Sequence, residues 1–429
     1  MDILTIQKKD RDYLRELAKK LYDISMNPEW EKKVILWEKK NALTKVRPLI
    51  LFMLPEEVWP ELIPASNLRI EKPYWRSIEW DLLKRIYRYE KIKDDYIIDN
   101  KLYIPIRYSL SDWYPGRKRP YAGDGKKAEK FYPSIENYTD LNKIKTPVLL
   151  DIDYELTKKE IEASQEVFGE FLNVIKNEPF YAGTDSIVTG WGLSAVDLLC
   201  ELRGLENIFY DMVDNPEFVH DAMHFITKAL IGYLDQMEAE GLLSLNNNSF
   251  CKNSNTPLGS NGLACLDNTQ KIKSDHKIIK SSHLWGYLMA QEFALISPEM
   301  TDEFVYSYQQ EIAKRFDLIC YGCCEPNDAK WNNIISRFEN LRAVSISHAS
   351  DLDVAAEKIA NKYVFSWKPH SMLIEPFEDN HIKDYLSHVF ELTKDCHLVC
   401  SMRDNLTLFG EADKVEKWVN IAMSLAEMY

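Results

Sequence analysis

The sequence has few of the features that would assign a chain quickly to a class of protein. It contains no stretch of about 18 uninterrupted apolar residues, which argues against a membrane-spanning helix. Acidic residues outnumber basic ones, 67 against 53, so the formal net charge is −14. This balance argues against nucleic acid as a partner, because phosphate binding needs clustered cations.

Cysteine is too scarce for a disulfide framework, with 8 residues in a chain of 429. The adjacent Cys323 and Cys324 could bridge each other only with strain. The opening segment "MDILTIQKKDRDYLREL" is charged and lacks the apolar centre of a secretory signal. We therefore expect a cytoplasmic protein, in which unpaired cysteines pack, bind metal or act as nucleophiles.

Apolar and aromatic residues, 45% and 12% of the chain, are abundant enough for a large folded core. Apolar residues recur at helical spacing in the first forty residues and again from Lys158 to Lys176. A further helix is predicted after Asn215, with Asn215 as its cap and Pro216 as its first residue. Short apolar runs predict strands that begin near Pro48, Leu102, Ile187, Leu242, Leu318, Ala343, Tyr363 and His397. Strands alternating with helices indicate parallel β/α units, and eight strands close a (β/α)8, or TIM, barrel.

The predicted organisation is an N-terminal helical extension at 1–45 followed by one α/β barrel at 46–429. Two insertions are expected, at about 108–150 and 246–282. The second is polar and is predicted to cover the active face. An open doubly wound sheet is the alternative fold, which the lack of a Gly-rich phosphate loop after the first strand disfavours.

Side chains that can do chemistry gather where strands are predicted to end, which is where TIM barrels keep their active sites. In "LICYGCCEP" the run ends in Cys323, Cys324 and Glu325. Arg403 with Asp404 and Asn405 ends another strand. The remaining strand-end residues are candidates for binding substrate: Asn246, Asn248, His348 with Asp351, Lys368 and His370.

Thiolate, imidazole and carboxylate are also the ligands that zinc takes, and three protein ligands leave a fourth position open for substrate. Each candidate has an alternative interpretation. Cys320, Cys396 and Cys400, taken singly, fit packing residues better than ligands. His348 is equally compatible with capping the helix that follows its strand.

Five segments together resemble a known family: "LICYGCCEP", "LRGLENIFYDMVDNPEFVHDAMHFIT", "HLWGYLMAQEFALISPEMTDEFVYSYQ", "KYVFSWKPH" and "MRDNLTLFGEADKVEKWVNIA". They are similar to the uroporphyrinogen decarboxylase superfamily. Within it, they resemble the corrinoid-dependent methyltransferases, in particular methyltransferase I of anaerobic O-demethylase systems. The likeness covers nearly the whole chain and is tightest after about Gly183.

The resemblance implies a TIM-barrel enzyme that transfers a methyl group from a methoxylated aromatic compound to the Co(I) of a corrinoid protein. Zinc would polarise the ether oxygen. The matching metal-ligand positions are Glu292 and Glu325, with Cys323 and Cys324 beside them. Glu325, Asp404 and Asn405 are the implied catalytic residues, and a homodimer is a further expectation.

The chain departs from the family pattern at one position, because Leu406 stands where a histidine follows the asparagine. Leucine cannot bind a metal. Either zinc takes another ligand, for which Cys323, Cys324 and His370 are candidates, or this copy has lost the metal and altered its activity.

Three other functions stay open. A uroporphyrinogen decarboxylase would bind a tetrapyrrole with eight carboxylates, which Glu56 and Glu57 after the first strand would repel. A methyltransferase II would pass methyl from a methyl-corrinoid to a thiol or tetrahydrofolate, but the thiol-directed "HxC…C" zinc motif is absent. The third is a non-catalytic barrel that binds a corrinoid protein.

Overall fold

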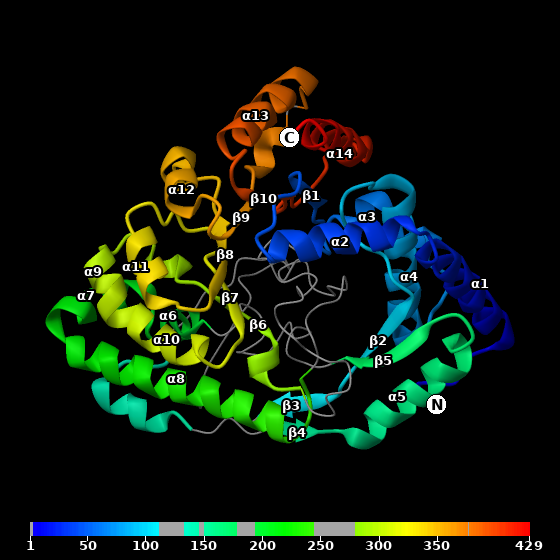
Figure 1. Ribbon diagram of the computed structural model, residues 1–429. Helices are drawn as coiled ribbons and strands as arrows, with labels where there is room; N and C mark the ends of the chain where they lie inside the picture. Colours follow the sequence, from blue (N-terminus) through cyan, green and yellow to red (C-terminus); the bar gives the residue numbers. More distant parts are fainter. Residues whose placement is uncertain (1–2, 111–132, 146–149, 178–193, 244–278, 376) are drawn as a thin grey trace.

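The computed structural model of the chain describes residues 3–110, 133–145, 150–177, 194–243, 279–375 and 377–429 (Figure 1). The fold is mixed α/β with a central parallel sheet. None of the helices within these ranges is long and apolar enough to cross a lipid bilayer.

Helices form the first part of the chain, as the sequence predicts. Their bounds are α1 Lys8–Ser25, α2 Glu29–Asn41, α3 Trp59–Leu62, α4 Pro73–Lys91 and α5 Tyr154–Phe168. In α1, Leu14, Ala18 and Leu21 follow helical spacing and are completely buried. This apolar stripe packs α1 against α4 and α5.

The central sheet contains six parallel strands in the order β1-β10-β9-β8-β7-β6 (Figure 1). Their bounds are β1 Leu49–Phe52, β6 Trp285–Leu288, β7 Leu318–Tyr321, β8 Leu341–Ile346, β9 Val364–Trp367 and β10 His397–Met402. Consecutive strands are neighbours, and the last strand pairs with the first. This order agrees with a (β/α)-type fold, although closure into a barrel is not seen among the described residues.

Both faces of the sheet are buried, which explains why its strands are apolar throughout. One face, which we call the inner face, carries Leu49, Leu51, Cys320, Val364 and Val399 and packs with the apolar residues of α1, α2 and α4. The other face packs on the helices of the second half. Those helices are α6 Ala195–Arg203, α7 Leu205–Asp214, α8 Pro216–Ala239, α9 Pro298–Thr301, α10 Ser307–Ala313, α11 Trp331–Arg337, α12 Leu352–Ile359, α13 Asp379–Leu392 and α14 Asp413–Ala426.

Among the described residues, the outer edge of β1 is covered by the segment that follows α4 and by Arg88, and not by a strand. Asp95 accepts from Ile50 N (2.7 Å) and donates its own N–H to Ile50 O (2.8 Å). Asp94 accepts from Phe52 N (2.8 Å), and Arg88 donates to Phe52 O (2.9 Å). The backbone N–H and C=O groups of Ile50 and Phe52 at this edge are therefore hydrogen-bonded without pairing to a second strand.

The strand predicted near Leu102 exists, but it does not lie beside β1. It is β2, Lys101–Pro105, and it pairs in parallel with β5, Asn173–Asn177, in a separate two-stranded sheet. A second small sheet joins β3, Tyr108–Leu110, to β4, Leu150–Ile152. The helix predicted as far as Lys176 is wrong at its end, because α5 stops at Phe168 and β5 follows.

Other expectations also need correction or lie outside the described residues. The strand predicted at Leu242 is absent from Leu242 and Leu243, and the rest of that segment and the one at Ile187 lie outside the described ranges. Strand β6 was not predicted. Asn215 precedes α8 but makes no capping hydrogen bond with its side chain, whereas Pro216 opens the helix as expected.

The two predicted insertions fall mostly outside the described residues. The division into a helical extension and a barrel domain stays a prediction.

Candidate functional site

A sharp turn after β7 delivers the "GCCE" segment to the carboxyl end of the sheet. Gly322 has φ +96°, which L side chains rarely adopt. A Cβ there would lie 3.1 Å from Ser345 O and 3.2 Å from the side-chain nitrogen of Asn327. Only glycine fits this turn without displacing its neighbours.

Glu325 is buried, with 2% of its surface exposed, and it joins the ends of two strands. One carboxylate oxygen accepts from Ala290 N after β6 (3.2 Å), and the other accepts from Cys323 N (2.8 Å). Burial, together with the nearby charge of Cys323, raises the pKa of Glu325 to about 7. Its described contacts are those of a residue that positions the turn.

Cys323 lies at the centre of the cluster and is 1% exposed, whereas Cys324 is half-buried. Their sulfur atoms are 3.7 Å apart. The pKa of the Cys323 thiol lies well below its ordinary value, because Cys324 hydrogen-bonds its sulfur and Lys368 and Arg403 favour the thiolate against the opposing effect of burial. The same hydrogen bond and burial raise the pKa of Cys324.

Strand alternation explains why the two cations reach Cys323. Val364 and Val399 face inward, so Lys368 and Arg403, each four residues further on, point to the same inner face. Lys368 is 3% exposed and its ammonium donates to Cys323 O (2.8 Å). Arg403 is 4% exposed and its charge acts on Cys323. We call Cys323, Glu325, Lys368 and Arg403 the strand-end cluster.

A pair of carboxyl groups lies close to this cluster. Burial and the neighbouring Glu292 carboxyl raise the pKa of Asp197 well above its ordinary value, and the charge of Cys323 adds to the effect. Both Asp197 oxygens and one Glu292 oxygen are buried without a hydrogen-bond partner among the described residues. The raised pKa of Asp197 favours its protonated form.

The two predicted histidines lie together at the ends of β8 and β9. The rings of His348 and His370 are edge to face, with centroids 4.4 Å apart, and both side chains are exposed. Partial burial and the neighbouring His370 lower the pKa of His348. His370 Nδ1 accepts from Met372 N (3.0 Å) and so caps a short turn. Asp351, and not His348, caps α12, because it accepts from the N–H groups of residues 353 and 354.

The end of β10 leads into Asp404, Asn405 and Leu406, the segment where the resemblance predicts a histidine at the position of Leu406. Asp404 is exposed with φ +64° and accepts from Arg403 Nε (3.2 Å). Asn405 is buried and donates to Ser371 O (2.9 Å), which ties this strand end to the segment after β9. Leu406 is 72% exposed. The predicted substrate residues Asn246 and Asn248 lie outside the described residues.

The predicted zinc ligands do not fit a zinc site in the described part of the chain. Within those ranges, no three His, Cys, Asp or Glu side chains converge where they could hold a metal ion. Both Glu325 oxygens accept backbone N–H groups, and the two cations beside Cys323 would repel a divalent ion. Glu292, Glu325, Cys323 and Cys324 therefore stay ligands only by prediction from the resemblance.

Sequence reasoning missed two parts of this site. Arg403 was recognised at a strand end but not as a site residue, although the two-residue period of "HLVCSMR" signals its inward direction. Asp197 follows the helix cap Ser194, and nothing in the local pattern indicates that it meets Glu292. Cys320, Cys396 and Cys400 are buried packing residues, as expected.

Known proteins resemble this chain only remotely. No family model matches it. No curated protein matches it. Among solved structures it is similar to a methyltransferase from Methanosarcina mazei, with 11% sequence identity over 92% of this chain and 98% of that one and a TM-score of 0.45. A likeness at this level establishes neither a shared fold nor a shared activity.

Proposed function

We propose that this protein is an enzyme that moves a methyl group from a methoxylated aromatic compound to the reduced cobalt of a corrinoid protein. The sequence motifs of corrinoid-dependent methyltransferases support the type of reaction. The observation that carries the proposal is the pair of buried cations, Lys368 and Arg403, at the carboxyl end of the sheet. The corrinoid protein, zinc and a homodimer stay predictions.

Lys368 and Arg403 suit the step in which the protein must stabilise a developing negative charge. When the methyl carbon leaves the ether oxygen, that oxygen keeps the bonding electron pair and becomes a phenolate. The corrinoid supplies the nucleophile, so the protein needs to orient the donor and stabilise the new negative charge. A fixed positive charge in a dry site does this much more strongly than one in water.

Lys368 is the better placed of the two cations to receive an oxyanion. An ammonium has three N–H donors, and among the described residues that of Lys368 has one acceptor, Cys323 O. The lowered pKa of Cys323 favours a thiolate beside the two cations, and the exposed Asp404 carboxylate pairs with Arg403. Glu325 positions the turn, and Arg403 adds a second charge.

The test is methyl transfer to cob(I)alamin, followed by loss of the Co(I) absorbance, with a panel of methoxylated phenols and with methylated amines and thiols as alternatives, each with and without zinc. We expect transfer from a methoxylated phenol and a loss of about 100-fold or more in kcat for Lys368→Met. Lys414→Met is the matched control, because Lys414 is 2% exposed on α14, outside the cluster, and is expected to leave the rate unchanged.

Two outcomes would refute the proposal. One is the absence of transfer from every methoxylated donor, with or without zinc. The other is a wild-type rate in a folded Lys368→Met variant.

A further inference from the structure

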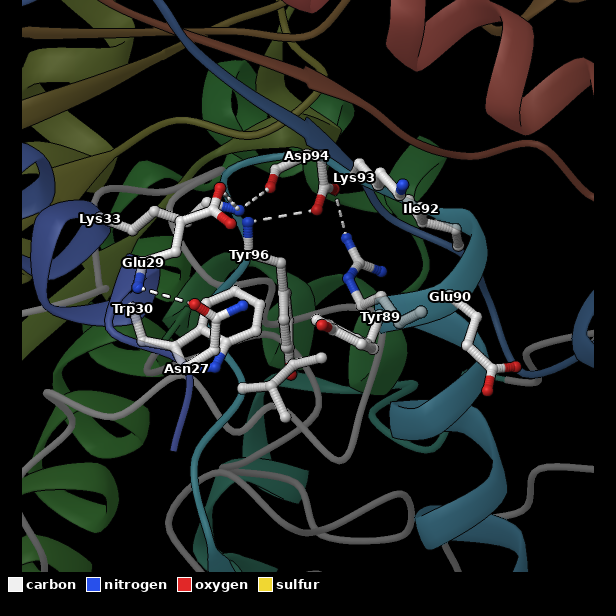
Figure 2. Close-up of a pocket in the computed structure, with 12 residues that line it drawn as sticks. Asn27, Glu29, Trp30, Lys33, Tyr89, Glu90, Ile92, Lys93, Asp94 and Tyr96 are labelled. Carbon is white, nitrogen blue, oxygen red and sulfur yellow. Dashed lines mark hydrogen bonds and ion pairs between the residues drawn. The ribbon is translucent and has the colours of Figure 1, made fainter. Parts of the chain in front are cut away.

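A cavity of about 360 Å³ lies between α2, the end of α4 and the segment that follows α4 (Figure 2), and no residue of the strand-end cluster lines it. Its size is within the range of small-molecule sites. Its lining residues come from the N-terminal helices and from the segment that covers the edge of β1.

Aromatic rings form the wall of the cavity. Trp30 of α2 and Tyr89 of α4 are edge to face with centroids 6.0 Å apart. Tyr96 also lines it, and the Arg88 guanidinium lies 4.1 Å from the centre of the Tyr96 ring. These surfaces suit the faces and edges of a flat apolar group.

The buried charges of the cavity are mainly positive. Lys33 and Arg88 are 8% and 5% exposed, and Asp94 is the single fully buried carboxyl group in the lining. Lys33 donates to Asp94 O (2.7 Å), as Figure 2 shows, and Arg88 pairs with the Asp94 carboxylate. Burial raises the pKa of Asp94. The interior therefore holds an excess of at least one positive charge.

The acidic residues at the margin do not neutralise this excess. Glu29 is 3.8 Å from Lys33, but its side chain is 59% exposed, so the pair is weak. Glu90 is exposed, bonds Lys20, and points away from the cavity in Figure 2. In addition, Arg88 Nε is buried and has no hydrogen-bond partner among the described residues. A buried donor in this state is rare and is satisfied by a ligand or water.

We propose that this cavity binds a small organic acid made of one carboxylate and one aromatic ring. The carboxylate would meet Lys33 and Arg88, and the ring would pack against Trp30 and Tyr89. A carboxylate supplies the missing negative charge and accepts from guanidinium and ammonium donors. The proposal does not depend on the proposed function.

Isothermal titration calorimetry of the full chain with benzoate tests this site. We expect a dissociation constant on the order of 0.1–1 mM, as for other ligands of this size. Benzamide, which has the same shape but no charge, should bind at least about tenfold more weakly.

Variants assign the binding to this cavity. Lys33→Met should weaken benzoate about tenfold or more, and Lys33→Arg should retain most of the affinity. Tyr89→Leu, which keeps every charge, should weaken it about threefold or more. Lys40→Met is the matched control, because Lys40 is a buried lysine of the same helix that lies over Trp37 as Lys33 lies over Trp30, yet it does not line the cavity.

The proposal is overturned if benzoate does not bind at about 10 mM, or if benzamide binds equally well. It is also overturned if benzoate binds Tyr89→Leu and Lys33→Met as tightly as the wild type, which would place the ligand elsewhere. Thermal melting of each variant checks its folding, and Tyr89→Leu decides the matter if Lys33→Met does not fold.

Discussion

Two regions of this molecule each bury a pair of cations, but they surround them with different partners. In the strand-end cluster, Lys368 and Arg403 lie beside the thiol of Cys323, and the carboxylate of Glu325 is directed at backbone N–H groups. In the cavity between α2 and α4, Arg88 is bonded to Asp94.

Arg88 is tied to the edge of β1 through a carboxylate, whereas Lys368 has no carboxylate partner among the described residues. Arg88 and Asp94 replace a missing strand at the edge of β1, so disturbing them should cost stability. Lys368 makes one described side-chain hydrogen bond, so its loss should be seen mainly in activity.

Asp94→Asn should be the most destabilising change. The Asp94 carboxylate accepts from Phe52 N (2.8 Å) and Tyr96 N (3.1 Å) and pairs with Arg88. The amide of asparagine is neutral, so Arg88 becomes a buried charge without its counter-ion. The amide N–H group would also face backbone N–H groups that need an acceptor. We expect a loss of about 3–5 kcal/mol in the free energy of unfolding, measured by urea denaturation.

The control for this change is Asp81→Asn on the same helix, α4. Asp81 lies 3.8 Å from Arg85, and its side chain is 23% exposed. It should lose less than about 1 kcal/mol. A similar small loss for Asp94→Asn would mean that the edge of β1 does not depend on this carboxylate.

Part of the helical structure and the meeting of side chains from different strand ends were predictable from the sequence. Periodic apolar positions predicted helix in the first forty residues, where α1 and α2 lie, and after Pro216, which opens α8. The run "LICY" predicted β7. The rule that functional side chains lie at strand ends predicted that Cys323 and Lys368 lie close together. These features depend on local spacing, which a single sequence displays directly.

What the sequence did not predict depends on contacts between distant segments. Strand β6 contains Gly286, which interrupts its short apolar run. The bonding of Asp94 and Asp95 to β1 uses side chains in place of a strand, which no periodicity reveals. Asp197 meets Glu292 only through the packing of α6 against the segment after β6.

The free energy of unfolding should depend on pH through the titration of Glu325. Its pKa of about 7 in the folded protein is above the ordinary 4.5, so the folded state binds this proton more tightly than the unfolded state does. The stabilisation is fully present below about pH 4.5 and is lost as the pH rises through about 7. The difference between the two pKa values corresponds to about 3 kcal/mol in the free energy of unfolding.

Comparing wild type with Glu325→Gln cancels the contribution of Asp197, which titrates in both proteins. The difference in unfolding free energy between them should change by about 3 kcal/mol from pH 4.5 to 8. The variant should also lose about 1–3 kcal/mol at every pH, since its amide N–H group faces a backbone donor. A difference that does not vary with pH would contradict the buried state of this carboxyl group.

The smallest effect concerns the turn that presents Cys323. Gly322 and Gly410 both have positive φ, +96° and +74°, so alanine at either position costs about 1 kcal/mol in backbone conformation. At Gly410 the added Cβ meets nothing within 4 Å, whereas at Gly322 it lies 3.1 Å from Ser345 O. That oxygen belongs to the backbone of a buried strand and cannot move freely.

Gly322→Ala should therefore lose about 2 kcal/mol, roughly 1 kcal/mol more than Gly410→Ala, in the same urea measurement. Because Ser345 Oγ also donates to Cys323 O (3.1 Å), the displacement should reach the thiol and change its rate of alkylation in Gly322→Ala alone. If the two alanine variants lose equal stability and alkylate as the wild type does, the position of Cys323 does not depend on this close approach, and the strand-end cluster tolerates movement that a catalytic site would not.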